Sequence, residues 1–209
     1  MKKIYVYLIS TQFRTGKAIR VLTGNTYNHV AISFKPDTKL LYSYARYRYR
    51  EPLSAGFGIE YTDRYYGIDE MADIKVYEYE VTDDHYNRII KNLGYYIENQ
   101  KSTKYNYLDI LGYPFKKHLK LGLTHTCLSF ALELLEINDV FTIGQFEKAL
   151  SKNKVLYEGP LDRFESTPTS GDIDFFENRG GTRIFAAAAR SLGILLERAM
   201  KKLVFAIIY

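Results

Sequence analysis

The chain of 209 residues contains a single cysteine, no tryptophan and only five prolines. With one cysteine an internal disulfide is impossible, so a disulfide-stapled secreted fold is excluded. No run of about 20 uncharged apolar residues occurs, so we expect no helix that spans a membrane. A phosphate-binding loop and a dinucleotide fingerprint are also missing, and four scattered histidines and one cysteine lack zinc-ligand spacing. We therefore expect neither a metal site nor an organic cofactor.

The N-terminal stretch MKKIYVYLIS begins with basic residues, but its apolar run of about seven residues is short for a signal peptide and lacks a small-residue cleavage site. Its alternating Ile4, Val6 and Leu8 instead predict a first β-strand. We therefore expect a cytoplasmic protein, with peripheral contact to a membrane left open. The net charge of +5 is mild, and it fits an anionic partner as well as ordinary solubility.

The composition, 46% hydrophobic and 25% charged, permits one packed domain. Hydrophobic periodicity and turn residues divide the chain into strands and helices. The predicted strands cover residues 2–10, 27–34, 39–47, 73–81 and 153–157, and the predicted helices cover residues 13–23, 83–100, 127–136 and 143–152. The glycine-containing stretch 55–58 predicts a loop. This order favours the α+β class, with an antiparallel sheet packed against helices.

Proline and glycine recur in residues 159–182, which predicts a linker after a domain that spans residues 1–158. Residues 183–209 carry an apolar stripe beside basic side chains, which predicts a C-terminal amphipathic helix. Such a helix docks on its own domain, pairs with a second copy in a homo-oligomer, or lies on an anionic membrane surface. Docking or oligomerisation is favoured, because packing is the commoner use of an amphipathic helix.

Cys127 stands where the polar stretch 124–126 gives way to a predicted helix, and Thr124 or Thr126 is able to cap that helix. The first-turn N–H groups and the helix dipole then favour a thiolate at Cys127. The same amides, including that of Leu128, are able to hold the oxyanion of a tetrahedral intermediate. The alternative is an inert thiol, because free cysteine is among the most buried residue types.

His29 stands near the start of the predicted strand 27–34, and the residues that follow it are mostly apolar. A nucleophilic cysteine needs an imidazole within hydrogen-bond reach, which takes its proton and later protonates the leaving group. Because such partners meet in space, the distance between His29 and Cys127 along the chain is no objection. The alternative is a hydrogen-bonded histidine at the edge of the strand.

Three short motifs follow one another along the chain: NHVAI (28–32), LYSYAR (41–46) and TCLSF (126–130). Together they resemble the YiiX-like and lecithin:retinol acyltransferase-like branch of the NlpC-type papain-like superfamily, over residues 3–157. In that branch the histidine strand precedes the cysteine helix, which is a circular permutation of the order in papain. The resemblance implies a sheet that carries His29 and packs against a helix headed by Cys127. It also implies a third polar residue that orients the imidazole.

A hairpin argument locates this third residue. With the turn at residues 36–37, Ala45 lies opposite His29. Ser43 then lies diagonal to His29 on the same face, and it is the predicted orienting residue. A serine brings no charge that would stabilise an imidazolium, so Ser43 could equally be an ordinary strand residue. For the same reason, a non-catalytic binding module on the same fold stays open as an alternative to an enzyme. By analogy with relatives, the Tyr107 hydroxyl contributes to an oxyanion hole; a core tyrosine is the alternative.

The predicted activity is that of a cysteine-dependent amidase or peptidase that forms an acyl-enzyme, with a peptide such as a cell-wall stem as substrate. The resemblance also keeps open the hydrolysis or transfer of a lipid acyl group. Residues 44–50 interleave tyrosine and arginine, a pattern able to stack bases and hold phosphates. Nucleic acid is nevertheless disfavoured as a partner, because the domain as a whole is only mildly basic.

Overall fold

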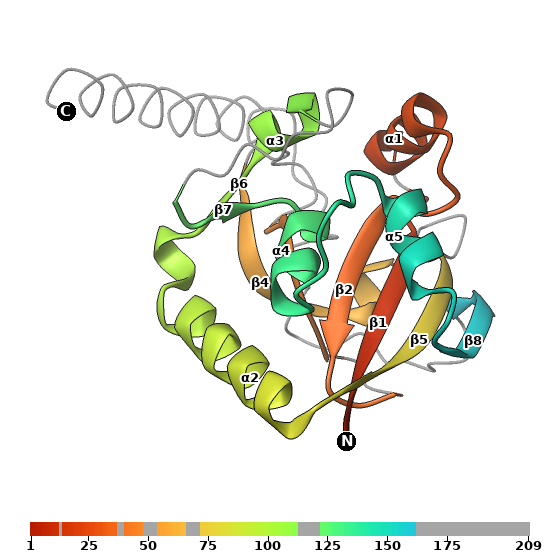
Figure 1. Ribbon diagram of the computed structural model, residues 1–209. Helices are drawn as coiled ribbons and strands as arrows, with labels where there is room; N and C mark the ends of the chain where they lie inside the picture. The colour runs from red at the N-terminus through yellow and green to blue at the C-terminus, as the bar shows by residue number, and fades with distance from the viewer. Residues whose placement is uncertain (13, 37–39, 48–53, 66–71, 113–121, 162–209) are drawn as a thin grey trace, which may run out of the picture.

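The described part of the chain comprises residues 1–12, 14–36, 40–47, 54–65, 72–112 and 122–161 of a computed structural model (Figure 1). The predicted helix 183–209 lies outside these residues, as does the predicted linker from residue 162 onward. No helix within these ranges is long and apolar enough to cross a bilayer.

Six strands form one antiparallel sheet in the order β4-β3-β2-β1-β5-β8. They are β1 (Lys2–Ser10), β2 (His29–Ser33), β3 (Leu40–Arg46), β4 (Ala55–Tyr61), β5 (Asp73–Val81) and β8 (Lys154–Pro160). Two short strands, β6 (Lys104–Tyr105) and β7 (Thr124–His125), pair in parallel next to β4. The helices are α1 (Arg14–Thr23), α2 (Asp83–Glu98), α3 (Tyr107–Gly112), α4 (Cys127–Leu134) and α5 (Ile143–Leu150), with 3-10 turns η1 (Thr62–Tyr65) and η2 (Gln100–Ser102). The predicted α+β class, with an antiparallel sheet packed against helices, is confirmed at this level.

Strand β1 runs through the middle of the sheet, between β2 and β5. Every residue from Ile4 to Ile9 is buried, whichever face of the sheet it points to. An uninterrupted apolar run is what a strand covered on both faces requires. Alternate residues of β1 enter two separate cores: Ile4, Val6 and Leu8 one, and Tyr5, Tyr7 and Ile9 the other.

Helices α2, α4 and α5 cover one face of the sheet (Figure 1). Helix α4 is buried over most of its circumference and packs across β2 and β3. A helix that is apolar nearly all round is stable only in such a buried position. The core on the opposite face contains Tyr65 of η1 together with Ala72 and Leu161, which flank β5 and β8. The packing of α4 across β2 and β3 thus fixes the helix that begins with Cys127 against the strand that begins with His29.

The stretch 55–58, predicted to be a loop, forms the first half of β4 at one edge of the sheet. This prediction is wrong because glycine in this stretch does not mark a turn. A Cβ at Gly56 would lie 2.3 Å from the Tyr47 hydroxyl oxygen and 3.0 Å from the Thr103 carbonyl oxygen. Close approach of the backbone to its neighbours, rather than a turn, explains glycine at position 56. At the other edge, β8 runs to Pro160, past the predicted boundary at residue 158.

Candidate functional site

The candidate site lies where β2 begins, at the end of the sheet that also carries α1 and α3 (Figure 1). His29, the first residue of β2, pairs with Ile9 of β1, so its backbone is held by the central strand. Helix α4 packs across β2 and β3 and begins with Cys127. The two residues that the sequence singles out are therefore brought to one place by the packing of a helix on a strand.

Thr126 caps helix α4 and fixes Cys127 as its first residue. The Thr126 hydroxyl accepts the N–H of Ser129 at 3.0 Å, and the Ser129 hydroxyl accepts the N–H of Thr126 at 2.8 Å. This reciprocal capping box leaves the N–H groups of Cys127 and Leu128 as the first two of the helix, with no acceptor inside the helix. Both amides therefore remain candidates for an oxyanion hole.

The Cys127 thiol is buried, with 5% of the residue exposed. Its polar partners are the His29 imidazole, the backbone N–H of Val30 and the hydroxyl of Tyr105. Burial alone would raise the pKa of the thiol, but the charge of the imidazolium and these hydrogen bonds lower the pKa below its ordinary value of 9.0. The surroundings therefore favour a thiolate paired with an imidazolium.

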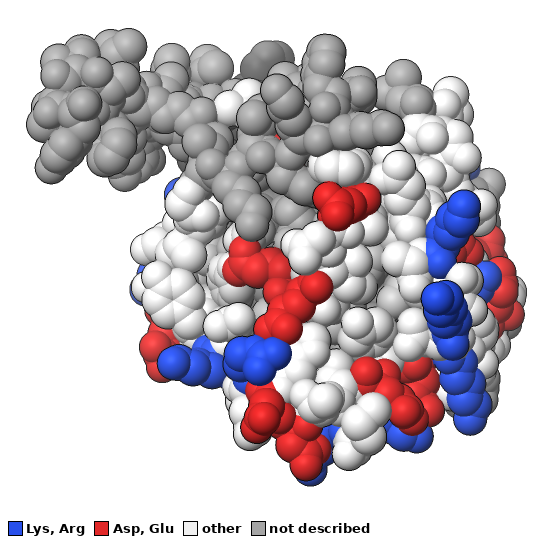
Figure 2. Space-filling view, in the orientation of Figure 1, with Lys and Arg blue, Asp and Glu red and all other residues white. Residues whose placement is uncertain are grey.

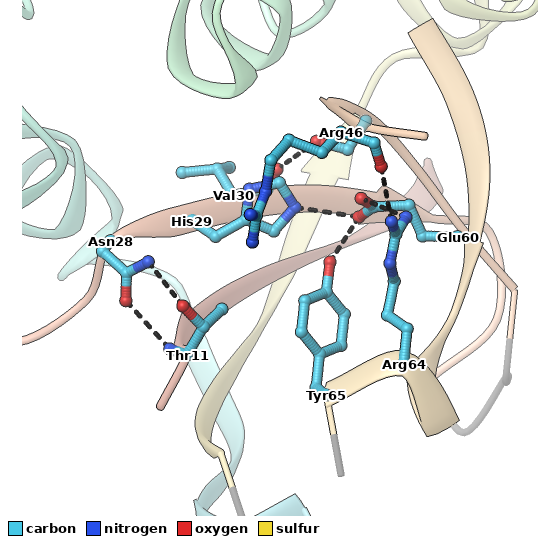
Figure 3. Close-up of polar contacts among 9 residues, drawn as sticks. Thr11, Asn28, His29, Val30, Arg46, Glu60, Arg64 and Tyr65 are labelled. Atoms are coloured by element: carbon cyan, nitrogen blue, oxygen red, sulfur yellow. Dashed lines mark hydrogen bonds and ion pairs between the residues drawn. The ribbon is translucent and has the colours of Figure 1, made fainter. Parts of the chain in front are cut away.

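Glu60 on β4 holds the other side of the imidazole (Figure 3). His29 Nε2 lies 2.8 Å from Glu60 Oε2, and only 10% and 1% of the two side chains are exposed. The Tyr65 hydroxyl also donates to Oε2, and Arg64 Nη1 donates to Oε1 at 2.8 Å. Because Nε2 faces the carboxylate, Nδ1 is the ring nitrogen left for the sulfur. Cys127, His29 and Glu60 thus have the arrangement of nucleophile, imidazole and carboxylate.

The charges of this arrangement stabilise one another. Burial alone would raise the pKa of Glu60, but the charges of His29 and Arg64 and the hydrogen bonds to the carboxylate lower it to about 2. Burial alone would lower the pKa of His29, but Glu60 and Cys127 raise it to about 10. At neutral pH the imidazole is therefore charged and the carboxylate ionised.

The same arrangement of side chains recurs on unrelated folds, so its geometry by itself assigns no family. Comparisons with protein-family models, curated proteins and solved structures found no match. The chemistry of the site is therefore argued from its own groups. A stabilised thiolate beside a charged imidazole, at a helix N-terminus, is suited to attack a carbonyl carbon and to transfer its acyl group.

Ser43, the predicted orienting residue, does not hold the imidazole. Its hydroxyl donates to the backbone carbonyl of Val30 at 2.6 Å, whereas Glu60 occupies Nε2 of His29. Ser43 thus hydrogen-bonds to β2 at Val30, the residue whose backbone N–H donates to the thiol. The predicted role of Ser43 is therefore corrected: the orienting side chain comes from β4 rather than from β3.

The register predicted for the hairpin is nevertheless the observed one, as the pairing of Ile32 with Tyr42 shows. The prediction of the orienting residue fails at the next strand. Because the stretch 55–58 is predicted to be a loop, β4 is not among the predicted strands, and Glu60 is not considered as a partner of His29. Alternating Phe57, Ile59 and Tyr61 around Glu60 are the signal from which this strand could have been found.

Tyr105, which is not among the predicted site residues, is a tyrosine whose hydroxyl hydrogen-bonds to the sulfur. Tyr107 begins α3, and its ring packs against that of Tyr105 with 4.8 Å between centroids. Strand β6 pairs Tyr105 with His125 of β7, immediately before the cysteine helix, which no local pattern reveals. A contribution of Tyr107 to an oxyanion hole stays a prediction.

His125, although near Cys127 in the sequence, belongs to an aromatic cluster in the core. Its Nε2 lies 2.8 Å from the hydroxyl oxygen of Tyr96, and this hydroxyl donates to Glu133 at 2.6 Å. The ring of Tyr44 packs against His125 with 5.2 Å between centroids. Because Tyr44 is fully buried, the first ring of the predicted base-stacking segment is not available to a base, and residues 48–50 of that segment lie outside the described residues.

A surface cavity of about 510 Å³ lies along α4 and the segment that follows it. Three carboxylates line it, those of Glu133, Glu136 and Asp139. Figure 2 shows acidic side chains in the middle of this face. A phosphate backbone is therefore disfavoured there. Within the residues that the structure describes, no three His, Cys, Asp or Glu side chains lie close enough together to hold a metal ion.

Proposed function

We propose that the chain is a cysteine-dependent hydrolase that cleaves an amide through an acyl-enzyme. The observation that carries this proposal is the buried contact between His29 and Glu60, with Cys127 on the other side of the same ring. The carboxylate also supports an enzyme over a binding module, since the module was suggested by the lack of such a group. The fold we propose is the permuted papain-like one, in the form of the YiiX-like and lecithin:retinol acyltransferase-like branch that the sequence motifs resemble.

The reaction begins with attack of the Cys127 thiolate on a carbonyl carbon, which forms a tetrahedral oxyanion. The first-turn N–H groups of Cys127 and Leu128 stabilise this oxyanion. The imidazolium of His29 gives its proton to the leaving amine as the carbon–nitrogen bond breaks, which leaves a thioester. Water then attacks the thioester and loses a proton to His29, and the acid and the thiolate–imidazolium pair are released. Glu60 stays ionised and keeps the ring in place throughout.

The first test is the pH profile of alkylation by iodoacetamide, followed by mass spectrometry. Cys127 is the only cysteine, so every added label reports on this site. We expect the alkylation rate of the wild type to be half-maximal well below the ordinary thiol pKa of 9.0. The substitution His29→Gln should move the profile to higher pH, because the thiolate loses its imidazolium.

His85→Gln is the matched control for this test. His85 interacts with the Leu134 carbonyl and with Glu136, and neither of these residues is a polar partner of the Cys127 thiol. Its loss should leave the profile unchanged. A thiol that reacts only above its ordinary pKa, or one that reacts equally in His29→Gln, contradicts the proposed pair.

Turnover is tested with p-nitroanilide amides and p-nitrophenyl esters of short and long acyl chains. An acyl adduct on Cys127 in the wild type, and none in Cys127→Ala, is the expected result. Faster reaction with amides supports a peptidase or amidase, whereas a preference for long acyl chains supports the lipid acyl activity. A protein that forms no adduct with any of these substrates contradicts the proposed hydrolase.

A further inference from the structure

Arg64 is a buried cation in direct contact with the carboxylate of the site, and the proposed reaction gives it no role. Only 4% of the residue is exposed. Its Nη1 donates to Glu60 Oε1 at 2.8 Å, and its Nη2 donates to the backbone carbonyl of Arg46 on β3 (Figure 3). A buried arginine is costly unless its charge and its donors are satisfied. Here the carboxylate that holds His29 balances the charge, and this carboxylate and the Arg46 carbonyl accept hydrogen bonds from the guanidinium.

The charges of the site explain why a cation is needed at this place. In the resting pair Cys127 is negative and His29 positive, so Glu60 adds an uncompensated negative charge to a buried region. After acylation the sulfur is neutral and the imidazole has lost its proton, so the negative charge of Glu60 is again not balanced by Cys127 and His29. Arg64 balances the carboxylate in both states. Without this balance, the cheapest response of a buried carboxylate is to take up a proton.

The geometry adds a second effect. Arg64 binds Oε1 of Glu60, which leaves Oε2 for His29 and for the hydroxyl of Tyr65. The guanidinium is itself tied to Arg46, so η1, β4 and β3 are joined through one side chain. A carboxylate held at one oxygen by a fixed donor presents the other oxygen in a fixed direction.

We infer that Arg64 is a positioning residue, which keeps Glu60 ionised and turned toward His29 and thereby stabilises the thiolate. This inference rests on the proposed function. Among the described residues, His29 from β2 and Arg64 and Tyr65 from η1 bind Glu60. Arg46 of β3 lines the same pocket as Glu60 and Arg64. The titratable groups that face the thiol are His29 and Tyr105.

The test compares Arg64→Met with the wild type in the alkylation assay across pH. Removal of a nearby cation disfavours both the carboxylate and the thiolate, so the half-maximal pH should rise and the rate at pH 6 should fall by about tenfold. Arg88→Met is the matched control, because Arg88 pairs with Glu136 at the surface, with 53% and 48% of the side chains exposed. It should leave the profile unchanged.

A double-mutant cycle with Glu60→Gln shows whether Arg64 acts through Glu60. In the Glu60→Gln background, Arg64→Met should change the rate at pH 6 by less than about threefold. This double variant removes both buried charges together, so it remains informative if Arg64→Met alone fails to fold. An equal loss in both backgrounds, or a wild-type profile in Arg64→Met, overturns the role of Arg64 alone. A wild-type thiol that is unreactive below its ordinary pKa overturns the proposed function as well.

Discussion

Glu60 illustrates how a single buried carboxylate acquires a function from its neighbours. An isolated carboxylate with 1% of its surface exposed would take up a proton. Here the imidazole of His29, the guanidinium of Arg64 and the hydroxyl of Tyr65 surround it instead. The Glu60 carboxylate therefore stays ionised and is able to orient the imidazolium of His29.

The contrast between Glu60 and Ser43 gives a prediction at this scale. Glu60→Gln keeps the shape of the side chain but removes its charge, so alkylation of Cys127 at pH 6 should fall by at least about tenfold. Ser43→Ala removes a hydrogen bond to Val30 at 2.6 Å and should lower the free energy of unfolding by about 1 kcal/mol. Its alkylation profile should match the wild type. Urea unfolding and the alkylation assay separate the two effects, and a shifted profile in Ser43→Ala would restore Ser43 as the orienting residue.

Helix α1 shows how an element is anchored beside the site. The Asn28 side chain, next to His29 in the chain, accepts the backbone N–H of Thr11 at 2.8 Å and Nη1 of Arg20 at 2.9 Å. Arg20 also donates to the carbonyl of Thr11. Gly16 lets the helix approach this network, because a Cβ there would lie 2.1 Å from the Thr11 hydroxyl oxygen. The position of α1 therefore depends on one small residue and one arginine.

Two glycine substitutions test this close approach. Gly16→Ala forces the helix away from Thr11 and Asn28, so the free energy of unfolding should fall by about 1–3 kcal/mol. A Cβ at Gly94 in α2 would meet no atom of the described residues within 4 Å beyond its own stretch of helix. Gly94→Ala should therefore raise stability by about 0.5–1 kcal/mol through helix propensity. Urea denaturation of both variants provides the measurement, and equal stabilisation in both would show that α1 does not pack at Gly16.

At the scale of the whole molecule, the thiolate–imidazolium pair shapes stability against pH. The raised pKa of His29 contributes stability that is complete below 6.5 and is lost as the pH rises through about 10. The lowered pKa of Cys127 contributes stability that is complete above 9.0 and is lost as the pH falls through the folded value. Where the pH lies above 6.5 and above the lowered pKa of the thiol but below 9.0, the folded pair holds one proton on the imidazole and the unfolded pair holds one on the thiol.

Above 6.5 and above the lowered pKa of the thiol, up to pH 9.0, the wild type should therefore show little change in unfolding free energy from this pair. In Cys127→Ala only His29 remains, so stability should fall from pH 6.5 upward by as much as about 1.4 kcal/mol per pH unit. The measurement is urea denaturation of both proteins at a series of pH values. Subtracting one free energy of unfolding from the other at each pH cancels the contributions of the other ionisable groups. If the two curves of free energy against pH are parallel, Cys127 and His29 do not share a proton.

Local patterns in the sequence predict much of this fold because they depend on neighbours along the chain. The apolar run of β1 requires a strand covered on both faces, and it is central in the sheet. Thr126 and Ser129 form their capping box within four residues, so the head of the cysteine helix is set locally. The resemblance in the motifs around His29 and Cys127 likewise depends only on residue types and their order.

The sequence by itself thus determined the element that carries each reactive group: a strand opened by His29 and a helix headed by Cys127. Tertiary structure alone decided which carboxylate meets the imidazole and which tyrosine meets the thiol. Glu60 and Tyr105 reach the site through the pairing of β3 with β4 and of β6 with β7. Such contacts join residues far apart in the chain, and their energy comes from burial and charge compensation that exist only after the strands have packed.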